Sequence, residues 1–242
     1  MTSLVAVNIY LWHTRTPMSN TETMSDRLEF DPGRFTVRAA GREWVITRTA
    51  DLDLLWEQMD ELGEDERIPY WTEIWPASAA LAEWLVEKSQ DLRGRACADL
   101  GCGLGLTTMA GGLAGASVVC LDYEFDAVRH ALRNAILNGV PAPLATMMDW
   151  REPAIRREAF SFVWGADVLY EKRFASGVAR FLDYALEPGG RAWLADPGRN
   201  FFAEFDAELA DRPFQRTLRE RRKLFWNGRD VQIYMHEFTK LS

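Results

Sequence analysis

The chain has 242 residues, 48% of them hydrophobic, so it is long enough and apolar enough to fold around a core rather than remain disordered. Its 28 lysine and arginine residues against 36 aspartate and glutamate residues give a net charge of −8, and we identify no basic block that would form a phosphate-binding surface. These features argue against nucleic acid as the main partner, and the lack of any run of ~18 apolar residues argues against a membrane span.

The N-terminal part of the chain divides into a lead-in and a small extension. Residues 1–33 are predicted to be a flexible or extended lead-in, and their start has neither the basic region nor the cleavage site of a secretory signal, so we expect a cytoplasmic protein. Residues 34–48 alternate apolar and polar side chains on both sides of Gly41, which is typical of a β-hairpin. Residues 51–62 place leucine and methionine at helical spacing, so the extension over residues 34–68 should also contain a helix.

Residues 69–242 alternate strand and helix signals and should form one domain. Apolar runs predict strands at residues 96–100, 117–122, 144–149, 160–167 and 190–196. Helical periodicity predicts helices at residues 76–88, 106–114, 124–139 and 172–186. Two further strands within residues 222–240 are joined by Asn227-Gly228, the strongest short hairpin pair. We therefore predict an α/β protein with a doubly wound, mostly parallel seven-stranded sheet, covered on both faces and ending in an antiparallel hairpin.

A glycine-rich loop follows the first strand of this series, in the stretch ADLGCGLG at residues 98–105. In doubly wound sheets the ligand lies beyond the carboxyl ends of the strands, and Gly101, Gly103 and Gly105 would let the backbone approach it closely. Asp99 stands just before these glycines. Its carboxylate would repel a pyrophosphate but would suit the ammonium and sulfonium of S-adenosylmethionine, so the acid favours this methyl donor over a dinucleotide.

Two more acidic residues end strands at positions that suit the same ligand. Asp122 ends the second strand about 20 residues past the loop, where a carboxylate accepts hydrogen bonds from ribose hydroxyls. Asp149 ends the third strand, where it would accept from the adenine amino group with Trp150 beside the ring. We include the neighbouring Cys102 and Tyr123 among the residues predicted to bind the donor.

No metal or disulfide is expected. The chain has three cysteines, Cys97, Cys102 and Cys120, without a C-x-x-C pair and in surroundings typical of a core. The three histidines are scattered along the chain without the spacing of metal ligands.

The D-L-G-C-G-L-G motif, with the two strand-end acids in place, resembles the class I, seven-β-strand S-adenosylmethionine-dependent methyltransferases over about residues 70–240. This resemblance implies a Rossmann-like methyltransferase fold. The stretch DVLY at residues 167–170 resembles the D-x-x-Y signature of the family 16 protein lysine methyltransferases. PYWTEIWPAS at residues 69–78 is similar to the tryptophan-containing entry segment of that family, and ADPGR at residues 195–199 is similar to its branch that methylates the β-subunit of electron transfer flavoprotein.

The resemblance implies roles for four residues and a substrate class. Trp71 would line the substrate side of the pocket and Trp75 the donor side, while Asp167 and Tyr170 would be catalytic and shape the acceptor pocket. The expected partner is a protein that presents a lysine, whose ammonium must lose a proton before it can attack the donor methyl. Asp167 would attract the cation, and aromatic walls would hold it by cation–π contact.

Three other functions stay open on the sequence. A small-molecule N- or O-methyltransferase would share the fold, and the N-terminal extension could then supply a lid. A non-catalytic module would bind S-adenosylmethionine without turnover. An NAD-linked oxidoreductase would share the glycine loop, although Asp99 and the missing third glycine of the G-x-G-x-x-G register argue against it.

Overall fold

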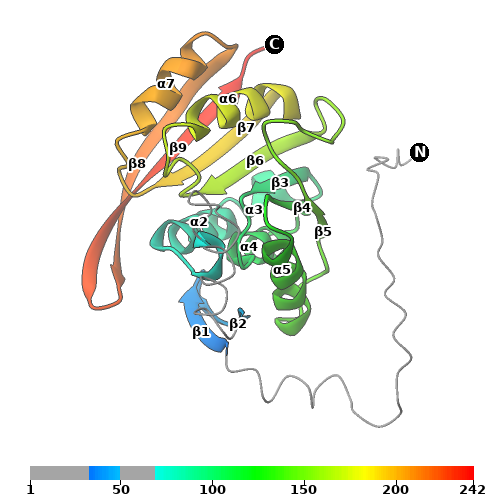
Figure 1. Ribbon diagram of the computed structural model, residues 1–242, viewed down its shortest axis with the longest axis vertical. Coiled ribbons are helices and arrows are strands. Elements are labelled where there is room, and N and C mark those ends of the chain that lie inside the picture. Colours follow the sequence, from blue (N-terminus) through cyan, green and yellow to red (C-terminus); the bar gives the residue numbers. More distant parts are fainter. Residues whose placement is uncertain (1–32, 50–68) are drawn as a thin grey trace, which may run out of the picture.

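The computed structural model of the chain describes residues 33–49 and 69–242 (Figure 1). Its strands are β1 (Arg34–Ala39), β2 (Arg42–Thr47), β3 (Ala96–Leu100), β4 (Ser117–Asp122), β5 (Leu144–Met147), β6 (Phe160–Ala166), β7 (Leu186–Asp196), β8 (Phe214–Trp226) and β9 (Arg229–Lys240). Its helices are α2 (Pro76–Glu87), α3 (Ser89–Leu92), α4 (Leu106–Leu113), α5 (Phe125–Leu137), α6 (Phe174–Ala185) and α7 (Phe202–Ala210), with a short 3-10 helix, η1 (Tyr70–Thr72).

The main sheet has seven strands in the order β5-β4-β3-β6-β7-β9-β8. The strands from β5 to β7 run parallel, whereas β9 is antiparallel to β7 and β8 is antiparallel to β9. The predicted fold class is therefore confirmed. Since all five parallel strands end at one edge of the sheet, the loops that follow them meet there.

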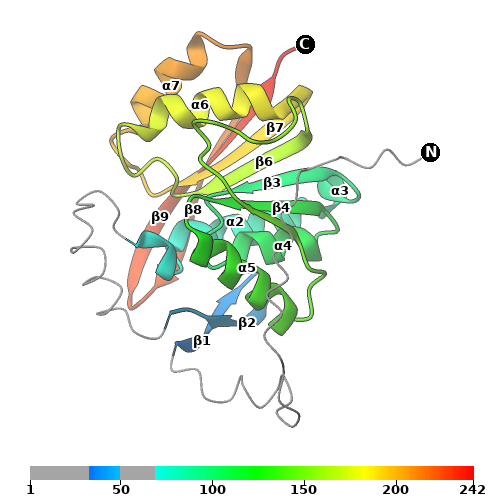
Figure 2. The ribbon, with the colours of Figure 1, turned by 45° about the vertical axis from the view of Figure 1, so that its right-hand side comes forward.

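Helices cover both faces of this sheet, as Figures 1 and 2 show. Helices α6 and α7 pack on one face, where Phe181 and Phe205 share a core with Val163 of β6. Helices α2 and α4 pack on the other face, where the neighbouring Trp164 of β6 lies with Leu85. Consecutive residues of one strand thus enter opposite cores, which is why the strands read as continuous apolar runs. Within the described ranges, no helix is long and apolar enough to cross a membrane.

Most predicted elements are present, with differences at their ends. Strand β7 begins at Leu186, directly after α6, rather than at residue 190, and β8 begins at Phe214 rather than near residue 222. Helix α7 was not predicted from the sequence. The helix predicted at residues 51–62 lies outside the described residues, as does nearly all of the lead-in.

The predicted N-terminal hairpin is confirmed as the pair β1–β2. Its two-residue turn, Ala40 and Gly41, has positive φ at both positions, 54° and 71°, as the tight turns that fit the twist of a hairpin require. Trp44 and Ile46 of β2 are fully buried in the same core as α2 and α4. The hairpin is therefore part of the main domain's core rather than a separate unit.

Asn134 of α5 and Asn138, the residue that caps the C-terminus of this helix, hold the backbone of β2. The buried Asn134 side chain accepts hydrogen bonds from the Thr47 amide and hydroxyl, both at 2.8 Å, and donates to the Thr47 carbonyl at 3.1 Å. It also donates to the Leu104 carbonyl in the glycine loop at 2.9 Å. One turn later, Asn138 accepts from the Val45 amide at 2.8 Å and donates to its carbonyl at 2.7 Å. The side chains of Asn134 and Asn138 thus bond the backbone of β2 as a neighbouring strand would. Asn134 also connects the N-terminal hairpin to the glycine loop.

The β8–β9 hairpin extends beyond the carboxyl edge of the sheet. Asp196, the last residue of β7, pairs with Tyr234, so the part of β9 that precedes Tyr234 and the paired part of β8 continue past the end of β7. Figure 1 shows this projecting end in orange and red. Its inner side rests on α2, where Arg222 makes a bidentate ion pair with Glu87, at 2.6 and 2.9 Å.

Candidate active site

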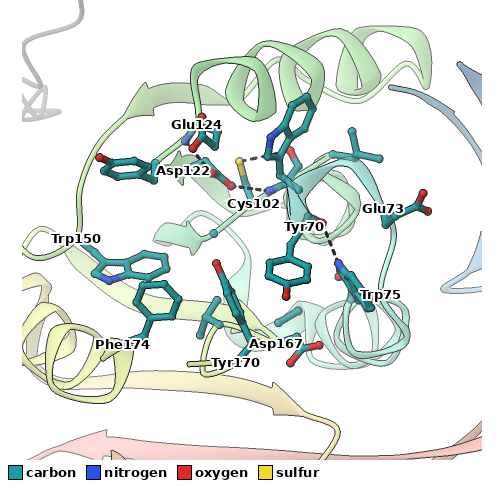
Figure 3. A pocket seen from close by; sticks show the side chains of 18 of the residues that line it. Tyr70, Glu73, Trp75, Cys102, Asp122, Glu124, Trp150, Asp167, Tyr170 and Phe174 are labelled. Atoms are coloured by element: carbon teal, nitrogen blue, oxygen red, sulfur yellow. Dashed lines mark hydrogen bonds between the residues drawn. The ribbon is translucent and has the colours of Figure 1, made fainter. Parts of the chain in front are cut away.

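A cavity of about 760 Å³ lies at the carboxyl edge of the sheet and is drawn in Figure 3. This volume falls within the range of about 300–1,000 Å³ that is usual for small-molecule sites. The cavity is lined by residues from 70–78, 101–106, 122–124, 149–151 and 166–174, together with Arg199. All of the residues predicted from the sequence to form the site lie on its wall except Asp99 and Gly105.

The glycine loop between β3 and α4 forms one wall. Gly103 has φ 51° and lies under the chain at Trp71, whose carbonyl oxygen would be 3.5 Å from an added Cβ. Gly105 is not on the cavity wall. It has φ 84°, and a Cβ there would come within 2.8 Å of the Ala131 backbone, so this glycine allows α4 to begin against α5. The third glycine thus serves helix packing and not ligand contact.

Asp99 also differs from its prediction. Its carboxylate is fully buried below the loop, where one oxygen accepts hydrogen bonds from Thr107 and Thr108 at 2.8 and 2.5 Å. Burial raises the pKa of Asp99 to about 6, and the two threonine hydroxyls oppose that rise. The acid therefore holds the start of α4 and does not face the cavity, so the electrostatic argument based on it must rest on other residues.

Asp122 is the last residue of β4 and lies on the cavity wall. One of its oxygens accepts from the Gly103 amide at 2.9 Å and the other from the Glu124 amide at 3.0 Å (Figure 3). Burial raises its pKa to about 6, while these backbone hydrogen bonds lower it. An ionised carboxylate has about four lone-pair sites, so two remain for a pair of hydroxyls. Tyr123, 39% exposed, and Cys102 line the cavity beside it.

Asp149 lines the cavity but is held by its own chain. Arg151 donates to both carboxylate oxygens from its side chain, at 2.7–3.0 Å, and to one of them from its amide at 2.8 Å. The side-chain hydrogen bonds from Arg151 lower the pKa of Asp149. Trp150, which lies between Asp149 and Arg151 in the sequence, also lines the cavity, and its ring meets that of Phe174 edge to face at 5.5 Å. An adenine amino group would have to share this carboxylate with Arg151.

Asp167 has a partner that the sequence did not reveal. Its carboxylate, 7% exposed, forms two parallel hydrogen bonds of 2.9 Å with the Arg199 guanidinium. Asp196 holds the backbone at Arg199 in place, since one of its carboxylate oxygens accepts hydrogen bonds from the amides of Gly198 and Arg199 at 2.7 and 2.9 Å. Arg199 falls in the quoted ADPGR stretch, which was the only signal for it.

Aromatic side chains form the wall between Asp167 and the glycine loop. Tyr70 meets Tyr170 edge to face at 4.9 Å and Trp75 at 6.0 Å, and Tyr170 meets Phe174 at 4.9 Å (Figure 3). Burial raises the pKa of Tyr170 well above its ordinary value, so its hydroxyl stays neutral. Trp75 and Tyr170 thus line the cavity as predicted, together with Tyr70 and Phe174, which were not predicted from the sequence. Trp71 lines the cavity and stacks on His130 at 5.8 Å.

The charges of the cavity wall favour a cationic ligand over a pyrophosphate. Five carboxylates line it, from Glu73, Asp122, Glu124, Asp149 and Asp167, against three arginines. One of the five, Glu73, is paired with Arg48, which lies outside the cavity wall. Each arginine already pairs with a carboxylate: Arg151 with Asp149, Arg199 with Asp167, and Arg173 with Glu171. Within the described ranges, no group of three or more histidine, cysteine or acidic side chains is placed to hold a metal ion.

Comparisons with known proteins find methyltransferases. No protein-family model matches the chain. Over 138 residues it is 32% identical to the electron transfer flavoprotein beta subunit lysine methyltransferase of Danio rerio, covering 56% of this chain and 53% of that protein. Over 159 residues it is 30% identical to the ribosomal protein L11 methyltransferase of Sorangium cellulosum, covering 62% of this chain and 48% of that protein. The chain thus spans about half the length of the curated relatives it matches, and its predicted resemblance to the flavoprotein-methylating enzymes is confirmed.

A solved structure supports the fold. The magnesium protoporphyrin IX methyltransferase from Synechocystis PCC 6803, crystallised with bound SAM, superimposes with a TM-score of 0.56 at 19% identity. The match covers 78% of this chain and 93% of that one. It confirms the Rossmann-like methyltransferase fold.

Proposed function

We propose that the chain is an S-adenosylmethionine-dependent methyltransferase that acts on a lysine side chain of a protein. The observation that carries this proposal is a single cavity that joins a strand-end carboxylate, Asp122, to an aromatic wall that includes Tyr170 and ends at Asp167. The first part suits the ribose of the donor, and the second suits an alkylammonium. The lysine methyltransferases among the relatives support the same substrate class.

The donor fits the cavity by charge and by hydrogen bonding. Asp122 would accept from the ribose hydroxyls, and the backbone at Gly101 and Gly103 would pass close to the methionine part. Asp149 and Trp150 would lie at the adenine. Arg151 and Arg199 are neutralised by Asp149 and Asp167, so the wall offers no free cation to a pyrophosphate from these two residues. The negative charge that remains on the wall includes Asp122 and attracts the ammonium and sulfonium of the donor.

The chain's own residues have to orient the lysine and favour its neutral form. When bound, S-adenosylmethionine supplies a methyl group on a sulfonium, and the attack on it is an in-line displacement that needs no covalent nucleophile. Tyr70 and Tyr170 exclude water from the acceptor, and reduced hydration lowers the pKa of an amine. Arg199 also lowers the pKa of the lysine amine, because its positive charge offsets the attraction of Asp167 for an ammonium. The Asp167–Arg199 pair would thus orient the lysine without holding it protonated.

Transfer of labelled methyl from S-adenosylmethionine into a cell extract tests this proposal. Asp122→Ala is the inactive control, because Asp122 lines the cavity, whereas a change at the buried Asp99 would disturb the fold. A labelled protein band that is absent in the control, with methyl-lysine in its hydrolysate, would support the proposal. Label only in the small-molecule fraction would refute it and favour a small-molecule methyltransferase.

A further inference from the structure

Although the chain is acidic overall, one surface of the molecule is basic. Arg219, Arg221 and Lys223 are alternate residues of β8, so their side chains point to the same face at intervals of about 7 Å. All three are exposed, and we call them the basic row. Arg222 points to the opposite face, onto α2. The absence of a basic block inferred from the sequence therefore does not hold for this strand.

The cations of the basic row have no ion-pair partner in the described part of the chain. Other arginines of the same strand do have one, because Arg216 pairs with Asp206 and Arg222 with Glu87. Within the basic row, Arg219 only contacts the ring of Tyr234, with its guanidinium carbon 5.2 Å from the ring centroid. The positive charge of the basic row is therefore available to a binding partner on this face of β8.

The basic row lies beside the acceptor end of the cavity. Arg221 pairs in register with Tyr234, which pairs in turn with Asp196 at the end of β7. The ring of Tyr234 lies 3.3 Å from the position of an added Cβ on Gly198. The next residue, Arg199, reaches into the cavity to pair with Asp167. A polypeptide with its lysine at Asp167 would thus continue over the loop that follows β7, at Gly198 and Arg199, and onto the basic row.

Protection of an edge strand does not account for these features by itself. Charged side chains on an edge strand prevent unwanted strand pairing, and β8 is at the edge of the sheet. Prevention of strand pairing requires neither charges of one sign on one face nor an exposed apolar side chain at the turn of the β8–β9 hairpin. Phe225, on the same face as the basic row, is 75% exposed. A cationic row that ends in an exposed aromatic side chain is instead typical of a surface that binds a partner.

We propose that the basic row docks an acidic segment of the methylated protein, next to the lysine that enters the cavity. This inference rests on the proposed lysine methyltransferase function and adds the charge of the substrate to it. Because the contact is electrostatic and exposed, it should set the affinity and association rate for the protein substrate and leave the chemical step unchanged.

Charge reversal of the basic row, Arg221→Glu with Lys223→Glu, tests the proposal. The matched control is Arg93→Glu with Arg95→Glu, two exposed arginines that precede β3 and so lie at the opposite edge of the sheet. Binding of a fluorescent polyglutamate peptide of about ten residues is measured by anisotropy, and we expect about tenfold weaker binding in the row variant only. The labelling rate of the substrate band at low extract concentration reports kcat/KM and should fall by a similar factor. Donor affinity and thermal stability should match those of the wild type.

Each outcome separates the docking surface from the enzymatic activity. Equal peptide binding by the wild type and the row variant would refute the surface, whether or not methyl transfer is found. Peptide binding that depends on the row, in a protein that labels no protein band, would retain the surface and refute the proposed function. An oligothymidylate of similar charge serves as a second probe, because nucleic acids also bind exposed cations. Tighter binding of the oligonucleotide than of the peptide, lost in the row variant, would reassign the surface to nucleic acid and overturn the proposal.

Discussion

Replacing Asp99 by asparagine should reduce the dependence of stability on pH. Asp99 titrates at about 6 in the folded protein because it is buried, against 3.8 for the ordinary aspartate expected in the unfolded chain. Below pH 3.8 the carboxyl group is protonated in both states and adds no penalty. As the pH rises from there through 6, the unfolded chain releases its proton first, so the folded state becomes less stable. Each pKa unit corresponds to about 1.4 kcal/mol, so the total loss is about 3 kcal/mol.

Urea denaturation at pH 4 and pH 8 measures this effect. At pH 4 the unfolded chain has already released part of its Asp99 proton, so the wild type should lose about 2.4 kcal/mol more of its free energy of unfolding between these pH values than Asp99→Asn does. The buried carboxyl groups of Asp122 and Asp196 also have a pKa raised to about 6 and titrate in both proteins, so the difference between the two proteins isolates Asp99. Asp211→Asn, at an exposed position, should behave like the wild type. If Asp99→Asn and the wild type lose the same stability over this interval, Asp99 is ionised without penalty and our reading of its environment is wrong.

Four further changes have expected outcomes. Asn134→Ala leaves buried partners of β2 and the glycine loop without hydrogen bonds, so the free energy of unfolding should fall by about 3 kcal/mol; a loss below about 1 kcal/mol would contradict the described contacts. Gly105→Ala combines a left-handed φ with a collision against α5 and should cost about 2 kcal/mol or more, measured in the same way. His236 has its pKa lowered to about 3 by burial, so the stability of the wild type should fall as the pH drops from 6.5 towards 3; His236→Phe should remove part of that acid sensitivity in thermal melts. Asp167→Asn should cut methyl transfer at least about tenfold while donor affinity, measured by calorimetry, stays within about threefold. An equal loss of both would place Asp167 in the donor site.

The fold could be predicted from the sequence because its signals are local. The buried strands are short apolar runs, and the turns at Gly41 and Asn227-Gly228 are defined by two residues each. Helix α7 was missed although Phe202, Phe205 and Leu209 lie at helical spacing in its sequence. The extra length of β8 was missed because its alternate residues are charged, so the strand lacks an apolar run.

The site was predictable where position along a strand decides it, and less so where a distant partner decides it. Asp122 follows directly from its place at the end of β4. The role of Asp99 depends on side chains that only the fold brings below the loop, namely the hydroxyls of Thr107 and Thr108. The pair between Asp167 and Arg199 joins the ends of two neighbouring strands, 32 residues apart in the sequence, and no local pattern reports it.

The asparagine contacts of α5 have a consequence for synthesis on the ribosome. The N-terminal hairpin is made early, yet Thr47 binds Asn134, which follows 87 residues later. At about 5–20 residues per second, Asn134 is added roughly 4 to 17 s after Thr47. During that interval Trp44 and Ile46 lack the complete core that buries them, because this core includes Ala135 of α5, which is made after Asn134. The nascent hairpin should therefore be a binding site for chaperones that recognise exposed apolar segments, and it should be released only when α5 has formed.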